Sequence, residues 1–245
     1  MKSLIKRFKK IINRITGKNL LIEVFSDIKN IQYKTINNND LFEKLQFLAT
    51  ESSAEYIKNY MSNAVALSSV HQILDKAISL TDQDREGLFL EFGVYSGSSI
   101  NYIASKTKNI VYGFDSFQGL PEKWRDGFDK SAFNRDGELP EVEKNVQLIK
   151  GWFDATLPLF VSKHPGPINL LHIDCDIYSS TKTIFENLGS RIVPGTVIVF
   201  DEYFNYPNWE NHEHKAFLEF IKESNLKFEY LYYNRYHEQV LARII

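Results

Sequence analysis

Residues 88–99 read LFLEFGVYSGSS, an apolar run followed by a turn with two glycines and by serines at which a helix can begin. A continuous apolar run of this length is typical of a strand that is buried on both faces of a parallel sheet. Glycine in the turn lets a ligand approach the backbone, although such turns also serve merely to pack a strand against a helix. The dinucleotide fingerprint is absent, because Tyr95 stands where its second glycine would be. The stretch predicts a strand, a turn and a helix, with a candidate ligand site at the turn.

Beyond this unit, short apolar runs alternate with amphipathic helical patterns, which indicates a sheet built from strand–helix–strand units. Strands are predicted at residues 88–94, 109–114, 146–151, 168–174, 196–201, 228–234 and 239–244. Only a short polar turn separates the last two, so they form an antiparallel pair. The expected fold class is α/β, a Rossmann-like sheet of seven strands. A nicotinamide-binding fold would more often end in another parallel strand.

The N-terminal region differs from the rest in charge. Residues 1–18 hold seven basic side chains and no acidic one, and their apolar residues recur at helical spacing. Such a helix packs on its own protein or on a second copy in a homodimer, or else lies weakly on an anionic membrane surface. The other residues hold 22 basic and 31 acidic side chains, which argues against a nucleic-acid substrate and for a small-molecule or carbohydrate acceptor.

A polar, Asn-rich arm follows, and then two helices are expected. Asp40 is a candidate cap for a helix that runs to about Thr50, and Ser62 for a helix that runs through Leu80. We expect residues 1–80 to form a basic helix, a linker and a helical cover, and residues 81–245 to form the catalytic domain.

The chain is of ordinary globular composition, with 245 residues of which 43% are hydrophobic and 24% charged. Cys175 is its one cysteine, so no intramolecular disulfide can form. No apolar run approaches the roughly 20 residues that span a bilayer, and no signal-peptide pattern opens the sequence. The expected location is the cytoplasm.

Two features follow the predicted strands at the carboxyl edge of the sheet. Asp115 ends the second strand, where a carboxylate can accept hydrogen bonds from a ribose diol, of either a nicotinamide cofactor or S-adenosylmethionine. Four further acids follow the fourth and fifth strands: Asp174, Asp176, Asp201 and Glu202. Adjacent parallel strands bring these acids together, where they repel unless a cation or protons intervene. A single acid would be read as a helix cap, but four together favour Mg²⁺ or another divalent cation.

Five motifs in order resemble those of the macrocin O-methyltransferase family, within class I S-adenosylmethionine-dependent methyltransferases: EFGVYSGSS, YGFDSFQGLP, KGWFDATLP, LLHIDCDIYSST and PGTVIVFDEY. The match runs from about Leu88 to Tyr203. It implies a metal-dependent O-methyltransferase. It also implies nine residues around the cofactor, three each for the methionine moiety, the ribose and the adenine: Glu91, Gly93 and Ser99; Asp115, Ser116 and Phe117; Gly151, Trp152 and Phe153. Plain core packing is as good an explanation of Trp152 and of Phe153 taken singly.

The same resemblance, and more distantly that to catechol O-methyltransferase, implies that Asp174, Asp201 and Glu202 bind the metal. The catechol enzyme has a lysine base three residues after its strand-four aspartate, where this chain has Ile177. Asp176 is therefore the candidate catalytic base. The expected acceptor is a sugar hydroxyl, on a glycosylated metabolite or a surface-polysaccharide precursor, followed by a phenol.

Two other functions remain open: a nicotinamide-dependent oxidoreductase, and a non-catalytic interaction module with the same fold. The segment 117–138 is expected either to close over the site or to form a static surface loop. His212 and His214 are expected on the surface, and His172 in the core, where it could support the metal ligands.

Overall fold

The computed structural model describes Ser26 and residues 40–82 and 85–245. The chain divides into two compact units, residues 1–47 and 48–245. The predicted basic helix of residues 1–18 lies outside the described residues, and the 80/81 domain boundary stays a prediction. Within the described ranges, no helix combines the length and the apolar character needed to cross a membrane.

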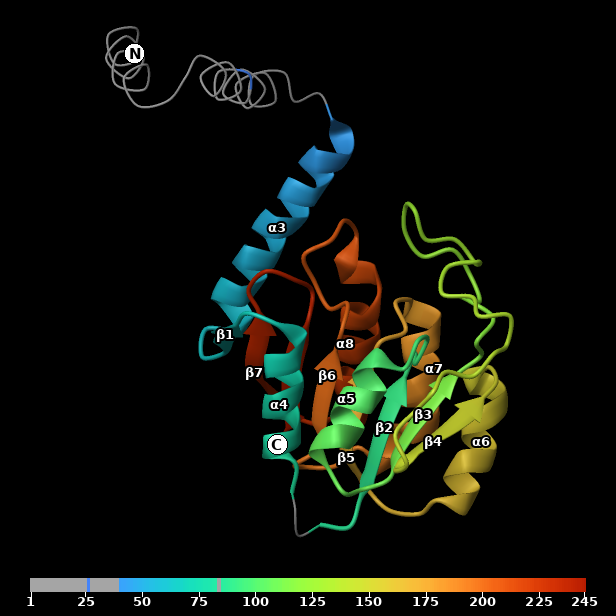
Figure 1. Cartoon of the computed structure of the whole chain (residues 1–245). Coiled ribbons are helices and arrows are strands. Elements are labelled where there is room, and N and C mark those ends of the chain that lie inside the picture. The colour runs from blue at the N-terminus through green and yellow to red at the C-terminus, as the bar shows by residue number, and fades with distance from the viewer. Residues whose placement is uncertain (1–25, 27–39, 83–84) are drawn as a thin grey trace, which may run out of the picture. The chain divides into compact units, whose positions relative to one another are not determined.

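Eight strands form one mixed sheet in the order β1-β7-β8-β6-β5-β2-β3-β4 (Figure 1). β8 runs antiparallel to both of its neighbours, and the other paired strands are parallel. The strands are β1 (Val65–Leu67), β2 (Leu88–Phe92), β3 (Val111–Asp115), β4 (Val146–Lys150), β5 (Ile168–Ile173), β6 (Val197–Phe200), β7 (Phe228–Asn234) and β8 (Val240–Ile244). The seven predicted strands and the antiparallel pair are confirmed, with ends that move by no more than two residues.

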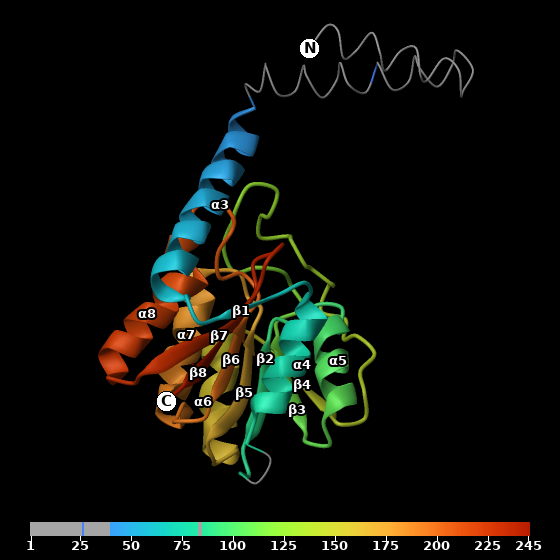
Figure 2. The same cartoon turned by 90° about the vertical axis from the view of Figure 1, so that its left-hand side faces the viewer.

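Helices cover both faces of the sheet (Figure 2). The helices are α3 (Leu41–Tyr60), α4 (Val70–Leu80), α5 (Ser98–Lys106), α6 (Phe153–Lys163), α7 (Tyr178–Leu188) and α8 (Glu213–Ser224), with short 3-10 turns η1 (Gly189–Arg191) and η2 (Trp209–Asn211). α4 and α5 pack on one face, and α6, α7 and α8 on the other. Alternate strand residues supply the two cores: Leu90 and Phe92 of β2 enter one, and Phe89 enters the other.

The expectations for the helical cover need correction. Asp40 does cap α3, because its Oδ1 accepts hydrogen bonds from the backbone N–H groups of Phe42 and Glu43, but the helix continues to Tyr60. The helix predicted from Ser62 is wrong in its first part. Residues Val65–Leu67 form β1, which pairs with the edge of β7, and the helix begins only after Ser69. An edge strand has unpaired backbone groups that a short extended segment can satisfy.

Gly93 joins the end of β2 to the edge where the acids lie. Its φ is +93°, and a Cβ at this position would stand 1.6 Å from the carbonyl oxygen of Asp174. Gly93→Ala should therefore lower the free energy of unfolding by at least about 3 kcal/mol or prevent folding, since the clash is with backbone. Gly166→Ala is the control, because its φ is +114° but nothing lies within 4 Å. Denaturant titration compares the two, and an equal cost for both would contradict the close approach.

Candidate active site

A cavity of about 620 Å³ opens at the carboxyl ends of β2, β3, β5 and β6. Ten of the thirteen residues predicted from the sequence line it: Gly93, Ser99, Asp115, Ser116, Trp152, Phe153, Asp174, Asp176, Asp201 and Glu202. The strand register explains the convergence. Asp174 donates its backbone N–H to Phe92 of β2, and Asp201 donates its own to Ile173 of β5, so successive strand ends stand side by side.

Asp115 organises the turns at one end of this cavity. Its Oδ2 accepts hydrogen bonds from the backbone N–H groups of Val94 and Tyr95, at 2.9 and 2.7 Å. Its Oδ1 accepts one from the N–H of Phe117 at 2.7 Å. Each carboxylate oxygen can accept more than one hydrogen bond, so the side chain can hold the turns and still bind a diol.

Three predicted cofactor residues do not line the cavity: Glu91, Phe117 and Gly151. The Glu91 side chain is fully buried, and it accepts a hydrogen bond from Ser99 Oγ and contacts His172. Phe117 is buried in the core on the side of α4 and α5. Trp152 is 38% exposed, whereas Phe153 packs edge-on against Phe92. Each of the first three motifs thus combines two predicted cofactor residues that line the cavity with one that does not.

The four acids form a cluster in which Asp176 and Glu202 are buried and Asp174 and Asp201 are half-buried. Burial raises the pKa of Asp174 well above its usual value, and repulsion by Asp201 adds to the effect. Burial, with repulsion by Asp201, also raises the pKa of Glu202. Burial would raise the pKa of Asp201 too, but His172 and a hydrogen bond from Gln239 lower it. For Asp176, burial raises the pKa to about 7, although the nearby Arg125 works against this.

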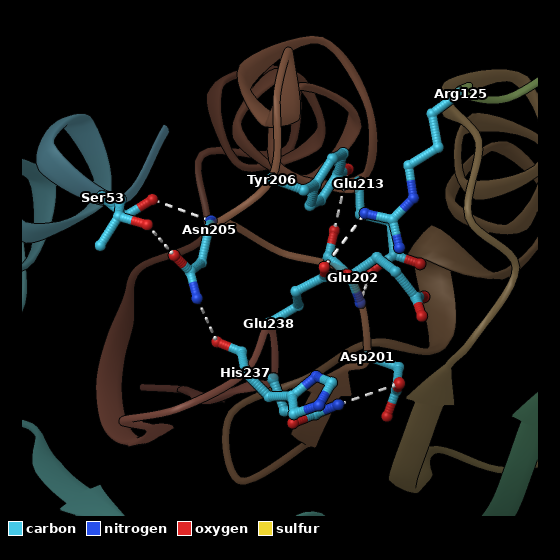
Figure 3. A network of polar contacts seen from close by, with 11 residues as sticks. Ser53, Arg125, Asp201, Glu202, Asn205, Tyr206, Glu213, His237 and Glu238 are labelled. Atoms are coloured by element: carbon cyan, nitrogen blue, oxygen red, sulfur yellow. Dashed lines mark hydrogen bonds and ion pairs between the residues drawn. The ribbon is translucent and has the colours of Figure 1, made fainter. Parts of the chain in front are cut away.

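Sequence reasoning missed one acid of this cluster, Glu213 at the start of α8. It is fully buried, and its Oε2 accepts a hydrogen bond from the backbone N–H of Glu202 (Figure 3). Its signal was present, because Glu213 shares the inward stripe of α8 with Ala216, Phe217 and Phe220. A carboxylate at helical spacing with apolar residues faces the core.

The prediction of surface histidines at 212 and 214 is wrong for His214. Its side chain is buried, and its ring lies edge-on to Tyr56 and Trp209. Burial lowers its pKa to about 4. His212 is half-buried, and burial lowers its pKa as well. The physical reason is that the His214 ring packs among the aromatic rings of Tyr56, Tyr203 and Trp209.

An ion pair between Arg125 and Glu238 links the segment 117–138 to the turn between β7 and β8. Nη1 of Arg125 lies 3.0 Å from Glu238 Oε1. Figure 3 shows the two side chains. The guanidinium also lies 3.8 Å from the ring centroid of Trp124 and 4.7 Å from that of Tyr206. Closure of this segment over the site stays a prediction.

The residues at the edge fit a divalent cation. Three buried polar atoms of this cluster have no hydrogen-bond partner among the described residues: Nε2 of His172, Oε2 of Glu202 and Oε1 of Glu213. Ligand atoms of His172, Asp174 and Asp201 all lie within 4.8 Å of one another. Unpartnered buried polar atoms are rare unless a ligand or ion satisfies them.

Comparison with known proteins agrees with this geometry. Residues 90–203 match the family model described as a methyltransferase domain. The chain has the class I methyltransferase fold. Among solved structures, CalS11, a calicheamicin methyltransferase, superposes with a TM-score of 0.56 at 20% identity, covering 85% of this chain and 93% of that one. The O-methyltransferase NovP gives 0.51 at 22% identity, covering 71% and 76%.

Two curated relatives are similar to this chain in sequence. One, from Streptomyces olivaceus, is 8-demethyl-8-(2,3-dimethoxy-alpha-L-rhamnosyl)-tetracenomycin-C 4'-O-methyltransferase, 28% identical over 144 residues that cover 48% of this chain and 53% of the relative. The other, demethyldecarbamoylnovobiocin O-methyltransferase of Streptomyces niveus, is 30% identical over 168 residues, covering 58% and 61%. The chain thus spans between half and two thirds of the length of these relatives.

Proposed function

We propose that the protein transfers a methyl group from S-adenosylmethionine to a hydroxyl group in a metal-dependent reaction. The observation that carries this proposal is the convergence of five sequence motifs on one cavity, with Asp115 at one end and the acids Asp174, Asp176, Asp201 and Glu202 at the other. The methyltransferase domain at residues 90–203 and the names of the two relatives support it.

At the cofactor end, we assign the methionine moiety to the turn at Gly93 and Ser99, the ribose to Asp115 with Ser116, and the adenine to Trp152 and Phe153. The contacts of Glu91 and Phe117 give them a supporting role. Glu91 accepts a hydrogen bond from Ser99 Oγ, and Phe117 donates its backbone N–H to the carboxylate of Asp115. Gly151 donates its own N–H to the carbonyl of Asp115 and so ties β4 to the same turn.

At the acidic end, Asp174, Asp201 and Glu202 would hold Mg²⁺ or another divalent cation. The chemistry that such a cation supplies is Lewis acidity, which lowers the pKa of a hydroxyl group. Asp176 faces the same cavity and accepts the hydroxyl proton on its carboxylate. Its pKa of about 7 suits a base that works near neutral pH. The surrounding side chains orient the acceptor oxygen toward the methyl group and exclude water.

For the acceptor, we propose a sugar hydroxyl of a glycosylated metabolite or of a polysaccharide precursor. The Streptomyces olivaceus relative is named as a 4'-O-methyltransferase of a rhamnosyl-tetracenomycin, and the motifs of this chain resemble those of the macrocin family. A phenol is the second candidate. The cytoplasmic location, the homodimer and the membrane contact of residues 1–18 stay predictions.

Metal removal tests this proposal. Transfer of labelled methyl from S-adenosylmethionine should be seen with a panel of glycosides, and a chelator should lower the rate at least about 100-fold. Added Mg²⁺ or Mn²⁺ should restore the rate. The affinity for S-adenosylhomocysteine, measured in parallel, should change less than about 3-fold, because the residues assigned to the cofactor are not the acids assigned to the metal. An unchanged rate in chelator would remove the metal from the mechanism, and cofactor binding without transfer to any acceptor would favour an interaction module.

A further inference from the structure

His172 occupies an unusual place for a histidine. It lies in β5, paired with Glu91 of β2 on one side and with Val199 of β6 on the other, and it has no solvent exposure. Residues two apart on a strand have their side chains on the same face of the sheet. The side chain of His172 therefore lies on the same face as that of Asp174, which directly follows the strand. A buried imidazole needs polar partners at both ring nitrogens.

One nitrogen has its partner. Nδ1 of His172 lies 2.8 Å from Oε2 of Glu91, whose side chain is also fully buried. The other oxygen of Glu91 accepts a hydrogen bond from Ser99 Oγ at 3.0 Å. A carboxylate that accepts Nδ1–H fixes the ring orientation and leaves the lone pair of the neutral imidazole on Nε2.

The second nitrogen has no hydrogen-bond partner among the described residues. Nε2 lies 3.9 Å from Oδ1 of Asp201, which is too long for a hydrogen bond. Two atoms that share one metal ion, each at roughly 2.1 Å from it, stand at most about 4.2 Å apart. The separation therefore suits two ligands of one ion, and a carboxylate oxygen of Asp174 belongs to the same group of atoms within 4.8 Å.

We propose that His172 is a nitrogen ligand of the metal centre together with Asp174 and Asp201, and that Glu91 is the positioning residue that holds its ring. A carboxylate behind a metal-binding histidine is the usual support for such a ligand. The inference rests on the proposed function for the presence of a metal, and it replaces an all-oxygen ligand set by a mixed one. Through Ser99, Glu91 then joins the cofactor turn to the metal centre. A nitrogen ligand favours Mn²⁺ or Co²⁺ over Mg²⁺, which prefers oxygen.

Mn²⁺ alone is the probe for the test, added to the full-length chain after removal of any affinity tag. Pulsed electron paramagnetic resonance should detect nitrogen coupled to the bound Mn²⁺ in the wild type. His172→Asn keeps an N–H for Glu91 but lacks Nε2. It should lose that coupling and bind Mn²⁺ about 10- to 100-fold more weakly, and Glu91→Gln should weaken binding by about 10-fold. His212→Asn is the matched control and should behave as the wild type.

The outcomes separate this inference from the proposed function. Mn²⁺ bound to the wild type without histidine coupling would overturn the role of His172 and leave metal-dependent methyl transfer intact. Absence of Mn²⁺ binding, with methyl transfer that persists in chelator, would overturn both the ligand and the metal requirement. His172→Asn could fail to fold, which loss of S-adenosylhomocysteine binding would reveal. The test then rests on the wild type alone, and absence of nitrogen coupling to Mn²⁺ in the wild type overturns the inference.

Discussion

Asp174→Asn should lower kcat at least about 100-fold while S-adenosylhomocysteine binds within about 3-fold of its wild-type affinity. Asp174 directly follows β5, and one of its carboxylate oxygens lies within 4.8 Å of ligand atoms of His172 and Asp201. The substitution keeps the size of the side chain but removes its negative charge. We therefore expect a large loss of metal affinity and a small change in cofactor affinity. Initial rates of methyl transfer and Mn²⁺ titration measure the two effects.

Asp75→Asn is the control for Asp174, because Asp75 is an exposed aspartate on α4 that pairs with Lys106. It should retain wild-type turnover. Wild-type turnover in Asp174→Asn, with wild-type Mn²⁺ affinity, would show that this carboxylate is not a ligand.

Asp176→Asn should lower kcat by about 10²- to 10⁴-fold with metal and cofactor affinities retained, since an amide cannot accept the hydroxyl proton. Asp176 is 5% exposed and lines the cavity beside Asp174. The loss should shrink for an acceptor with a more acidic hydroxyl, such as a phenol, because less help from a base is then needed. Steady-state rates on a sugar and a phenol give the comparison. Loss of metal affinity in this variant would instead make Asp176 a ligand.

The part of the site that could be predicted lies on strands with strong patterns. Mostly apolar runs specify β2, β5 and β6, and residues that follow parallel strands must meet at one edge of the sheet. Asp174 and Asp201, which follow β5 and β6, and Asp115, which ends β3, could therefore be placed at this edge from the sequence.

Other features depend on contacts between distant segments, which no local pattern specifies. Glu91 is followed by a glycine turn, so the motif suggests a cofactor contact, but the side chain points to His172 across the sheet. β1 is only three residues long and exists because β7 offers it an edge. His214 has polar neighbours in sequence, and only the packing of α8 shows that it is buried.

Calorimetric titration of S-adenosylhomocysteine into the purified protein, with Mg²⁺ and then with chelator, is the most direct test of the central claim. We predict saturable one-site binding under both conditions, in a cavity where Asp115 and the turn at Gly93 are already held in place. No binding of S-adenosylhomocysteine, together with saturable binding of a nicotinamide cofactor, would contradict the claim and indicate that the protein is an oxidoreductase.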